Sequence, residues 1–278
     1  MWPLYVLFSK ILNVEAAEEE EEEEDDDDVI DGLVGKWHDQ DLSMSHFVEV
    51  PHVNQLQSWD CGLACVVMVL NTVGVSDCSI EALADISSTT SIWTVDLAYL
   101  LKRFSVRFSY FTVTIGANPS YSVETYYKEQ LPTDVLRVDM LFEKASEEGI
   151  NILCRSINEK EISCLILSGK YIVIALVNQY KLSRTWLEDA ILSSLDDSNR
   201  EYVGHYIVIC GYDADSDEFE IRDPASSRKN EKISSKCLEE ARKSFGTDED
   251  LLVISLESSN KQKKSCWGKL PPLNINNT

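Results

Sequence analysis

The stretch CGLACVVMVL at residues 61–70 sets the architecture that this sequence predicts. It is apolar nearly all round, and a helix without a polar face belongs in the middle of a domain. Asp60 stands directly before it as an N-cap or first-turn residue, and Gly74 suits its C-terminal end. The pattern therefore predicts a central, buried helix that begins with a cysteine.

On either side of this stretch the chain divides into a helical part and a strand-rich part. Helical patterns occur at residues 79–86, 94–101, 126–131, 135–148, 159–167 and 237–245. Strand patterns occur at residues 104–115, 150–155, 171–177, 205–212, 218–222 and 251–256, of which 205–212 and 218–222 form a hairpin. Helices first and an antiparallel sheet afterwards indicate an α+β fold, not a doubly wound one.

The composition supports a folded core with a separate acidic segment. The chain has 278 residues, of which 44% are hydrophobic, an ordinary fraction for a globular domain. The formal net charge is −23, and much of it lies in an unbroken acidic run at residues 18–28, which repels itself. We expect an N-terminal segment with a disordered acidic linker at residues 1–44, one domain at 45–258 and a flexible tail at 259–278.

Charge and cysteine usage exclude several classes of protein. An acidic chain without a basic patch is not expected to bind nucleic acid. Residues 1–14 are apolar but too short to span a membrane and lack the features of a signal peptide, although a short anchor or docking segment stays open. The acidic run is either a plain tether or a contact for a basic partner. Eight cysteines without a Cys-x-x-Cys pair predict reduced thiols in a cytosolic or nuclear protein.

Three residues far apart in the sequence fit the demands of thiol chemistry. A nucleophilic cysteine needs a lowered thiol pKa, a proton acceptor and donors for an oxyanion. Cys61 lies where a helix N-terminus supplies partial positive charge. Of the four histidines only His205 heads a buried strand, and Asp223 follows on the return strand of the hairpin, where it can orient the imidazole. These three are the candidate catalytic residues.

The neighbours of these residues supply further candidates. Gln55 lies on the loop that leads to Cys61, and its amide is expected to donate to the oxyanion together with the Cys61 N–H. Substrate contacts are expected from Trp59, Asp60, Gly62, Gly204 and Arg222.

A lone buried cysteine more often acts as a small hydrophobe than as a nucleophile. That interpretation applies to Cys65, Cys154, Cys164 and Cys210. Cys61 and Cys65 are one helical turn apart, but no second pair with zinc spacing exists.

One acidic turn is a candidate metal site. Asp213 and Asp215 begin a pattern like that of a calcium loop, but Glu218 stands where the loop needs glycine and Pro224 where it needs the closing glutamate. The turn is therefore either a weak metal site or a polar hairpin connection.

The catalytic candidates also carry a resemblance to a known class. The motifs are Q-x5-CG-x-AC from Gln55 to Cys65, GHY-x-V-x-x-GYD from Gly204 to Asp213, and Asp223-Pro224. They are similar to the bacteriocin-processing peptidase domains of ABC exporters, which are papain-like. This resemblance implies a papain-like cysteine-peptidase fold.

A second resemblance extends from Val50 to Leu256. It rests on VPH at residues 50–52, SWDCGLAC at 58–65, SIWTVDLAYLL at 91–101, EISCL at 161–165 and DPASS at 223–227. These segments resemble the soluble plant guanylyl cyclase family, whose animal relatives are called guanylyl cyclase domain-containing proteins. Membership implies a soluble, Mg²⁺-dependent enzyme that forms cyclic GMP from GTP.

The residues themselves give this activity no nucleotide motif, because neither a Walker loop nor a Gly-x-Gly-x-x-Gly run occurs. Arg222, Arg228 and Lys229 are candidate phosphate contacts or solvated loop residues. Three hypotheses follow: a cyclase on a papain-like scaffold with GTP near Cys61, a cysteine hydrolase or transferase for peptide or isopeptide bonds, and an inactive module that binds partners. The cyclase comes first because the resemblance spans most of the chain.

Overall fold

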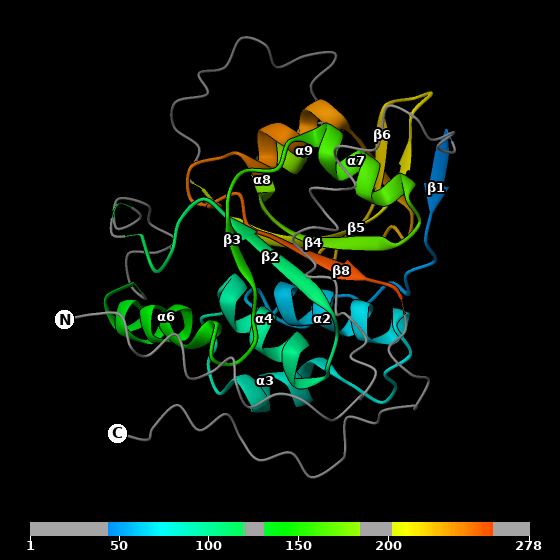
Figure 1. Ribbon diagram of the computed structural model, residues 1–278. Coiled ribbons are helices and arrows are strands. Elements are labelled where there is room, and N and C mark those ends of the chain that lie inside the picture. The colour runs from blue at the N-terminus through cyan, green and yellow to red at the C-terminus, as the bar shows by residue number, and fades with distance from the viewer. Residues whose placement is uncertain (1–43, 119, 121–130, 184–201, 258–278) are drawn as a thin grey trace, which may run out of the picture. The chain divides into compact units, whose positions relative to one another are not determined.

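One mostly antiparallel sheet organises the domain. A computed structural model of the chain describes residues 44–118, 120, 131–183 and 202–257 (Figure 1). The strands run in the order β3-β2-β8-β4-β5-β6-β7, and β1 pairs with the far end of β5. Their bounds are β1 Ser45–Phe47, β2 Phe108–Thr112, β3 Ile152–Cys154, β4 Tyr171–Asn178, β5 Gly204–Asp213, β6 Glu218–Arg222, β7 Glu231–Ser234 and β8 Leu251–Ser255. Only the β2–β3 pair among these strands is parallel, so the predicted α+β class is confirmed.

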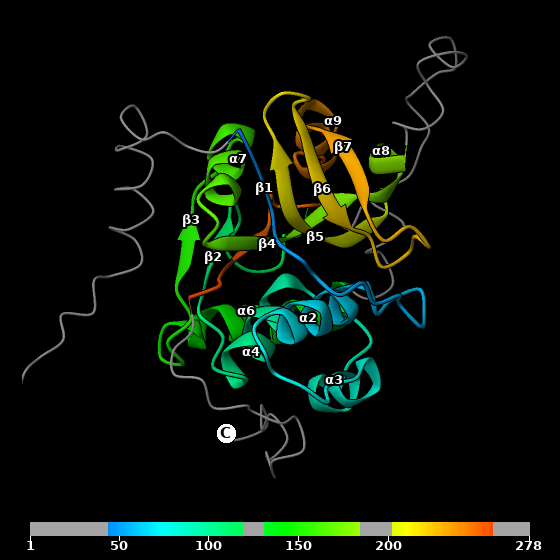
Figure 2. The ribbon, with the colours of Figure 1, turned by 90° about the vertical axis from the view of Figure 1, so that its right-hand side faces the viewer.

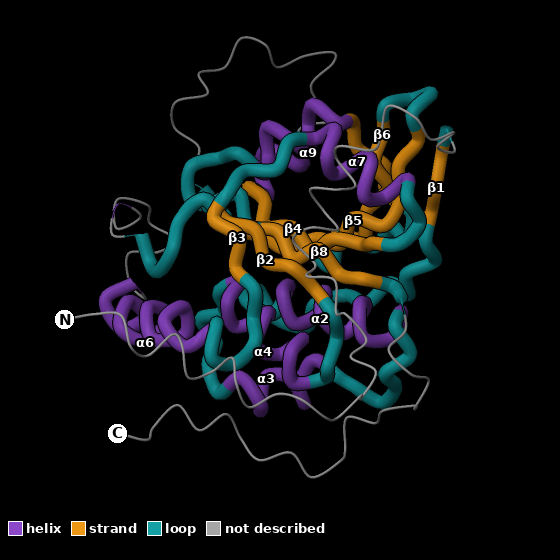
Figure 3. Tube along the Cα trace, in the orientation of Figure 1, coloured by secondary structure: helices purple, strands orange, loops and turns teal. Residues whose placement is uncertain are grey.

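Helices cover both faces of the sheet (Figures 1 and 3). On one face lie α2 (Cys61–Thr72), α3 (Ile80–Ser87), α4 (Thr94–Arg103) and α6 (Leu131–Ala145). On the other lie α7 (Glu159–Leu167), α8 (Gln179–Ser183) and α9 (Ser235–Arg242). Figure 2 shows β6 and β7 beside β5, away from β2 and β3. After the short β1, helices α2, α3 and α4 follow one another up to Arg103, and beyond it strands and helices are interspersed.

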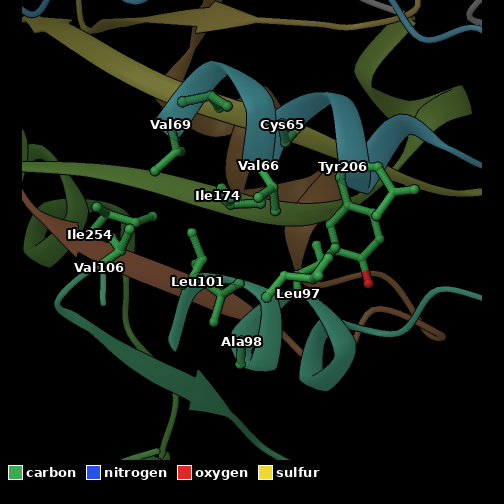
Figure 4. Packing of buried hydrophobic residues seen from close by; sticks show 14 of the residues in the cluster. Cys65, Val66, Val69, Leu97, Ala98, Leu101, Val106, Ile174, Tyr206 and Ile254 are labelled. Atoms are coloured by element: carbon green, nitrogen blue, oxygen red, sulfur yellow. The ribbon is translucent and has the colours of Figure 1, made fainter. Parts of the chain in front are cut away.

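Helix α2 is the centre of the core, as its sequence predicts. Its residues from Cys61 to Leu70 are all buried. Figure 4 shows Val66 and Val69 pointing from α2 toward Ile174 of β4 and Ile254 of β8, with α4 packed below. Each buried aliphatic side chain of this kind contributes about 1.5–3 kcal/mol to the free energy of folding. This packing fixes the helix whose first residue is Cys61.

Several element boundaries differ from the sequence prediction. The strand expected from residue 104 begins at Phe108, because α4 continues to Arg103. Helix α9 begins at Ser235, since the Ser234 hydroxyl accepts a hydrogen bond from the Cys237 N–H. The short elements β1, β7 and α8 were not predicted. The acidic segment, most of the helix expected at 126–131 and the C-terminal tail lie outside the described residues.

The cysteines correct one expectation. Free thiols are present at Cys61, Cys65, Cys154, Cys164, Cys210 and Cys237. Cys78, however, is disulfide-bonded, so the prediction of reduced thiols throughout is wrong for this residue. Cys78 lies in the turn before α3 and is only partly buried, so a second thiol can reach it. The irregular spacing of the cysteines in the sequence does not reveal this bond.

No helix in the described ranges is long and apolar enough to cross a membrane.

Candidate active site

Cys61 opens helix α2 and is 6% exposed. The loop before it is closed by Asp60, whose carboxylate accepts hydrogen bonds from the Leu56 and Gln57 N–H groups, both at 3.0 Å. The Cys61 N–H lies at the first helical position, where backbone N–H groups have no acceptor inside the helix. It is therefore a donor for an oxyanion that forms beside the thiol.

His205 and Asp223 meet directly. His205 Nε2 lies 2.7 Å from Asp223 Oδ1, and the two side chains are 3% and 15% exposed. Asp223 also accepts a hydrogen bond from the Ala225 N–H at 2.8 Å. Because Asp223 occupies Nε2, the other ring nitrogen is left for the Cys61 thiol, whose proximity contributes to the raised pKa of His205.

A β-bulge brings these two residues to the same face of the sheet. Gly211 pairs with Glu220, but beyond Cys210 the register shifts by one residue, so that Val208 pairs with Arg222. Extending this register places Asp223 opposite Ile207, on the face of β5 that also carries His205. Without the bulge Asp223 would lie opposite Val208 and point to the other face, because side chains alternate along a strand.

The electrostatics of the pair favour a charged imidazole. Burial lowers the pKa of His205, but hydrogen bonds with Asp223 and Cys61 outweigh it and raise the pKa to about 9. Burial raises the pKa of Asp223, but the hydrogen bond and charge of His205 bring it below its usual value. An imidazolium at neutral pH is the partner that stabilises a neighbouring thiolate.

Cys65, one turn further along α2, lies in a different environment. Burial, followed by the nearby Cys61 and Asp223, raises the pKa of the Cys65 thiol well above its usual value. It is fully buried and packs in the core. The expected role of Cys65 as a small hydrophobe agrees with this placement.

Cys61 lines a cavity of about 540 Å³ at one end of the sheet. Its described walls come from Gln55, Ser58, Trp59, Cys61, Thr90, Ser91, Ile92, Trp93, Thr94, Leu176, Gln179, Val203, Gly204, Tyr206, Asp248 and Asp250. The volume suits a ligand the size of a few residues or a nucleotide. Of the predicted substrate contacts, Trp59 and Gly204 lie in its walls.

Helix α6 holds one of these walls in place. The indole N–H of Trp93 donates to Asp134 at 3.1 Å, and Arg137 donates to the Ser91 carbonyl at 2.9 Å. Arg137 also pairs with Asp96 of α4 at 2.5 Å. This network ties the segment before α4 to α6.

Three of the residues predicted to contact the substrate have structural roles instead. The Asp60 carboxylate is bound by N–H groups of the loop before it. Gly62 lies where a Cβ would come to 3.0 Å from side-chain carbons of Leu97 and Tyr206, so a larger residue would press on the packing of α2 against α4 and β5. Arg222 is 2% exposed, and its guanidinium donates to the Val50 carbonyl and pairs with Glu220.

Gln55 lines the cavity, but its amide is engaged. Its Nε2 donates to the Gln57 carbonyl at 2.8 Å, and its backbone N–H donates to the Pro224 carbonyl at 2.9 Å. In this arrangement the Gln55 amide nitrogen already has an acceptor, whereas the Cys61 N–H has none inside its own helix.

The turn predicted to bind magnesium is held by contacts within the protein. Asp213 accepts a hydrogen bond from the Asp215 N–H within its own turn, and lies 3.8 Å from Lys232 Nζ. No group of three or more His, Cys, Asp or Glu residues gathers in the part of the chain that the structure describes. The candidate phosphate contacts Arg228 and Lys229 are exposed and lie outside the described cavity walls.

Sequence reasoning missed two acidic wall residues. Asp248 and Asp250 lie just before β8, whose first residue pairs with β4 near the end of the sheet that carries His205. The available signal was a pair of aspartates directly before an apolar strand, which by itself also fits an ordinary turn.

A cysteine at the start of a buried helix, a histidine near the start of β5 and an aspartate directly after the neighbouring antiparallel strand β6 make the arrangement of a papain-like thiol site. Residues 50–254 match the family model described as guanylylate cyclase. The chain is 59% identical over 271 residues to Guanylyl cyclase 1 of Arabidopsis thaliana, covering 94% of this chain and 99% of the relative. The chain belongs to this guanylyl cyclase family, as its sequence motifs indicated.

Solved structures give weaker likenesses. The cysteine protease xylellain from Xylella fastidiosa aligns with 81% of this chain and 88% of its own at 12% identity and a TM-score of 0.41. The peptidase domain of Streptococcus ComA, a bifunctional ABC transporter, aligns with 74% and 98% at 14% identity and a TM-score of 0.37. At these scores neither carries an argument about this chain.

Proposed function

We propose that this chain forms cyclic GMP from GTP. The observation that supports this activity is its membership of the guanylyl cyclase family, including the 59% identity to Guanylyl cyclase 1. The reaction is an attack of the ribose 3′-hydroxyl on the α-phosphate, in which the bond to the departing pyrophosphate breaks. It needs no protein nucleophile, so Cys61 is not required for it.

The cavity at Cys61 can accommodate the purine ring of GTP, but its described walls include no lysine, arginine or histidine to bind the triphosphate. Its volume of about 540 Å³ and its aromatic walls, among them Trp59 and Trp93, suit a purine ring. Because the predicted ligands Asp213 and Asp215 lie outside the described cavity walls, no step is assigned to Mg²⁺. His205, with a pKa of about 9, is mostly protonated at neutral pH and is a poor acceptor for the 3′-hydroxyl proton.

The test is cyclic GMP formation, measured by mass spectrometry with purified protein, GTP and Mg²⁺. We expect product from the wild type and from Cys61→Ala, because the chemistry is intramolecular. Equal signals from wild type and from a mock purification of untransformed cells would contradict the proposal.

A second function is favoured by one specific observation, the arrangement of Cys61, His205 and Asp223. We propose acyl transfer or hydrolysis at a peptide or isopeptide bond. The Cys61 thiolate attacks the carbonyl carbon, and the oxyanion accepts a hydrogen bond from the Cys61 N–H. The His205 imidazolium gives its proton to the leaving amine, and a thioester remains.

The second half-reaction regenerates the enzyme. Water or an amine gives a proton to His205 as it attacks the thioester carbonyl, and the sulfur leaves as thiolate. Asp223 holds the imidazole and stabilises its charged form. The test is labelling of Cys61 by a peptide-based electrophile at neutral pH, followed by intact mass. Labelling no faster than that of free cysteine would sink this proposal and leave the cyclase proposal untouched.

A further inference from the structure

We propose that the cavity at Cys61 binds a primary ammonium group of the substrate at its acidic wall, formed by Asp250 and Asp248. The group is the side chain of a lysine or a free amino terminus. This inference rests on the thiol activity proposed above and names its substrate class.

Asp250 is a buried polar residue of the cavity wall whose carboxylate is not fully hydrogen-bonded. It lines the cavity and is 6% exposed. The Tyr110 hydroxyl donates to its Oδ2 at 3.1 Å, and its backbone carbonyl accepts from the Leu176 N–H at 3.1 Å. Its Oδ1 is buried without a donor in hydrogen-bond geometry among the described residues, and the groups near the carboxylate are the neutral hydroxyls of Thr94, Thr112 and Tyr110. A buried carboxylate oxygen without a donor is costly, and a ligand ammonium group would supply that donor.

No described wall residue of the cavity brings a positive charge to Asp250. Burial and then the neighbouring Asp248 raise the pKa of Asp250 to about 7, against the hydroxyls of Thr94, Thr112 and Tyr110. A cation held here would lower that pKa again, because an opposite charge favours the ionised carboxyl. The site thus gains from a positive ligand in a way that an ordinary surface aspartate does not.

The rest of the cavity agrees with a cationic substrate. Its described walls include no lysine, arginine or histidine. Trp59, Trp93 and Tyr206 are aromatic wall residues, and aromatic rings can attract ammonium groups. At Cys61 the start of α2 supplies the opposite polarity, which suits a carbonyl oxygen. One cavity therefore offers places for a carbonyl group and for an ammonium group.

The experiment compares electrophilic peptide probes that differ at a single residue. The full chain is treated at pH 8 with acyloxymethyl ketones that carry lysine, norleucine or glutamate next to the electrophile. A fourth probe carries norleucine and a free amino terminus in place of an acetylated one. The rate of Cys61 labelling is measured by intact mass for the wild type, Asp250→Asn and Asp248→Asn. Glu143→Gln removes an exposed carboxylate of α6 as the matched control.

We expect the lysine probe or the free-amine probe to label Cys61 about tenfold faster than acetylated norleucine, the size of one charged hydrogen bond. Which of the two is faster identifies the source of the ammonium group. Asp250→Asn should reduce this preference, taken as the ratio of the amine-probe rate to the norleucine rate within that variant, to less than about threefold. Glu143→Gln should retain the preference.

Two outcomes overturn the inference in different ways. Labelling of Cys61 without preference for either amine probe, or a preference that survives in both Asp250→Asn and Asp248→Asn, contradicts the ammonium site alone. Absence of labelling with every probe contradicts the thiol activity and the inference together. Thermal unfolding of each variant identifies any rate change that follows from loss of folding, and Asp248→Asn then carries the comparison.

Discussion

The two ends of strand β5 both carry ionisable residues, but they have different surroundings. At the first end His205 is 3% exposed and meets Cys61 from α2 and Asp223 from beyond β6. At the other end Asp213 is partly exposed in a turn and contacts its own neighbours and Lys232. Both ends were candidate sites by sequence. The difference indicates that a site arises where buried groups from distant segments converge, and that short acidic spacing by itself makes a turn.

The largest expected effect separates Cys61 from its neighbour on α2. Cys61→Ala should abolish neutral-pH labelling by a peptide electrophile, a loss of about 10³-fold or more, because the nucleophile itself is gone. Cys65→Ala should retain labelling, since burial keeps that thiol protonated. The measurement is the labelling rate by intact mass. Equal loss in both variants would break the distinction between the two cysteines.

The next effect concerns the base. His205→Gln should slow Cys61 labelling at pH 7 by about 10²-fold or more, within the range for a positioned acid–base group. The rate of this variant should recover as pH rises, because hydroxide then ionises the thiol without help. A rate at pH 7 within threefold of the wild type would contradict a working Cys61–His205 pair.

Much of the candidate site at the His205 end of β5 could be predicted from sequence. The apolar runs at α2 and β5 identify buried elements, and a cysteine and a histidine at their first residues stand out against that background. Such signals are local, since they depend only on which residues are polar within an apolar run.

The parts that could not be predicted depend on long-range pairing. The bulge at Cys210 decides the face on which Asp223 lies, and an apolar strand pattern looks the same with or without it. The hydrogen bonds of Asp60 and the burial of Arg222 follow from how loops pack. Asp250 is a wall residue only because β8 inserts between β2 and β4.

A smaller effect links the His205 pair to stability. The pKa of His205 is raised from 6.5 to about 9. The contribution of the charged imidazole to the free energy of unfolding is therefore fully present below about pH 6.5 and is lost as pH rises through 9. At 1.36 kcal/mol per pKa unit the contribution is at most about 3 kcal/mol. Urea unfolding of wild type and His205→Gln should show a stability difference that shrinks from pH 6 to pH 9.5. A constant difference over this range would contradict the raised pKa.

The smallest effect is expected at the other end of the strand. Asp213→Asn and Asp215→Asn should each change the unfolding free energy by no more than about 0.5 kcal/mol, as is usual for exposed substitutions. Labelling of Cys61 and cyclic GMP formation should stay within about twofold, because the turn contributes no described wall of the cavity. Isothermal titration with Mg²⁺ should give the same heats for the wild type and for the double variant. A selective loss of cyclic GMP formation or of Mg²⁺ binding in the double variant would make this turn a metal site. The two ends of β5 would then differ in their chemistry, with a metal at one end and a thiol at the other.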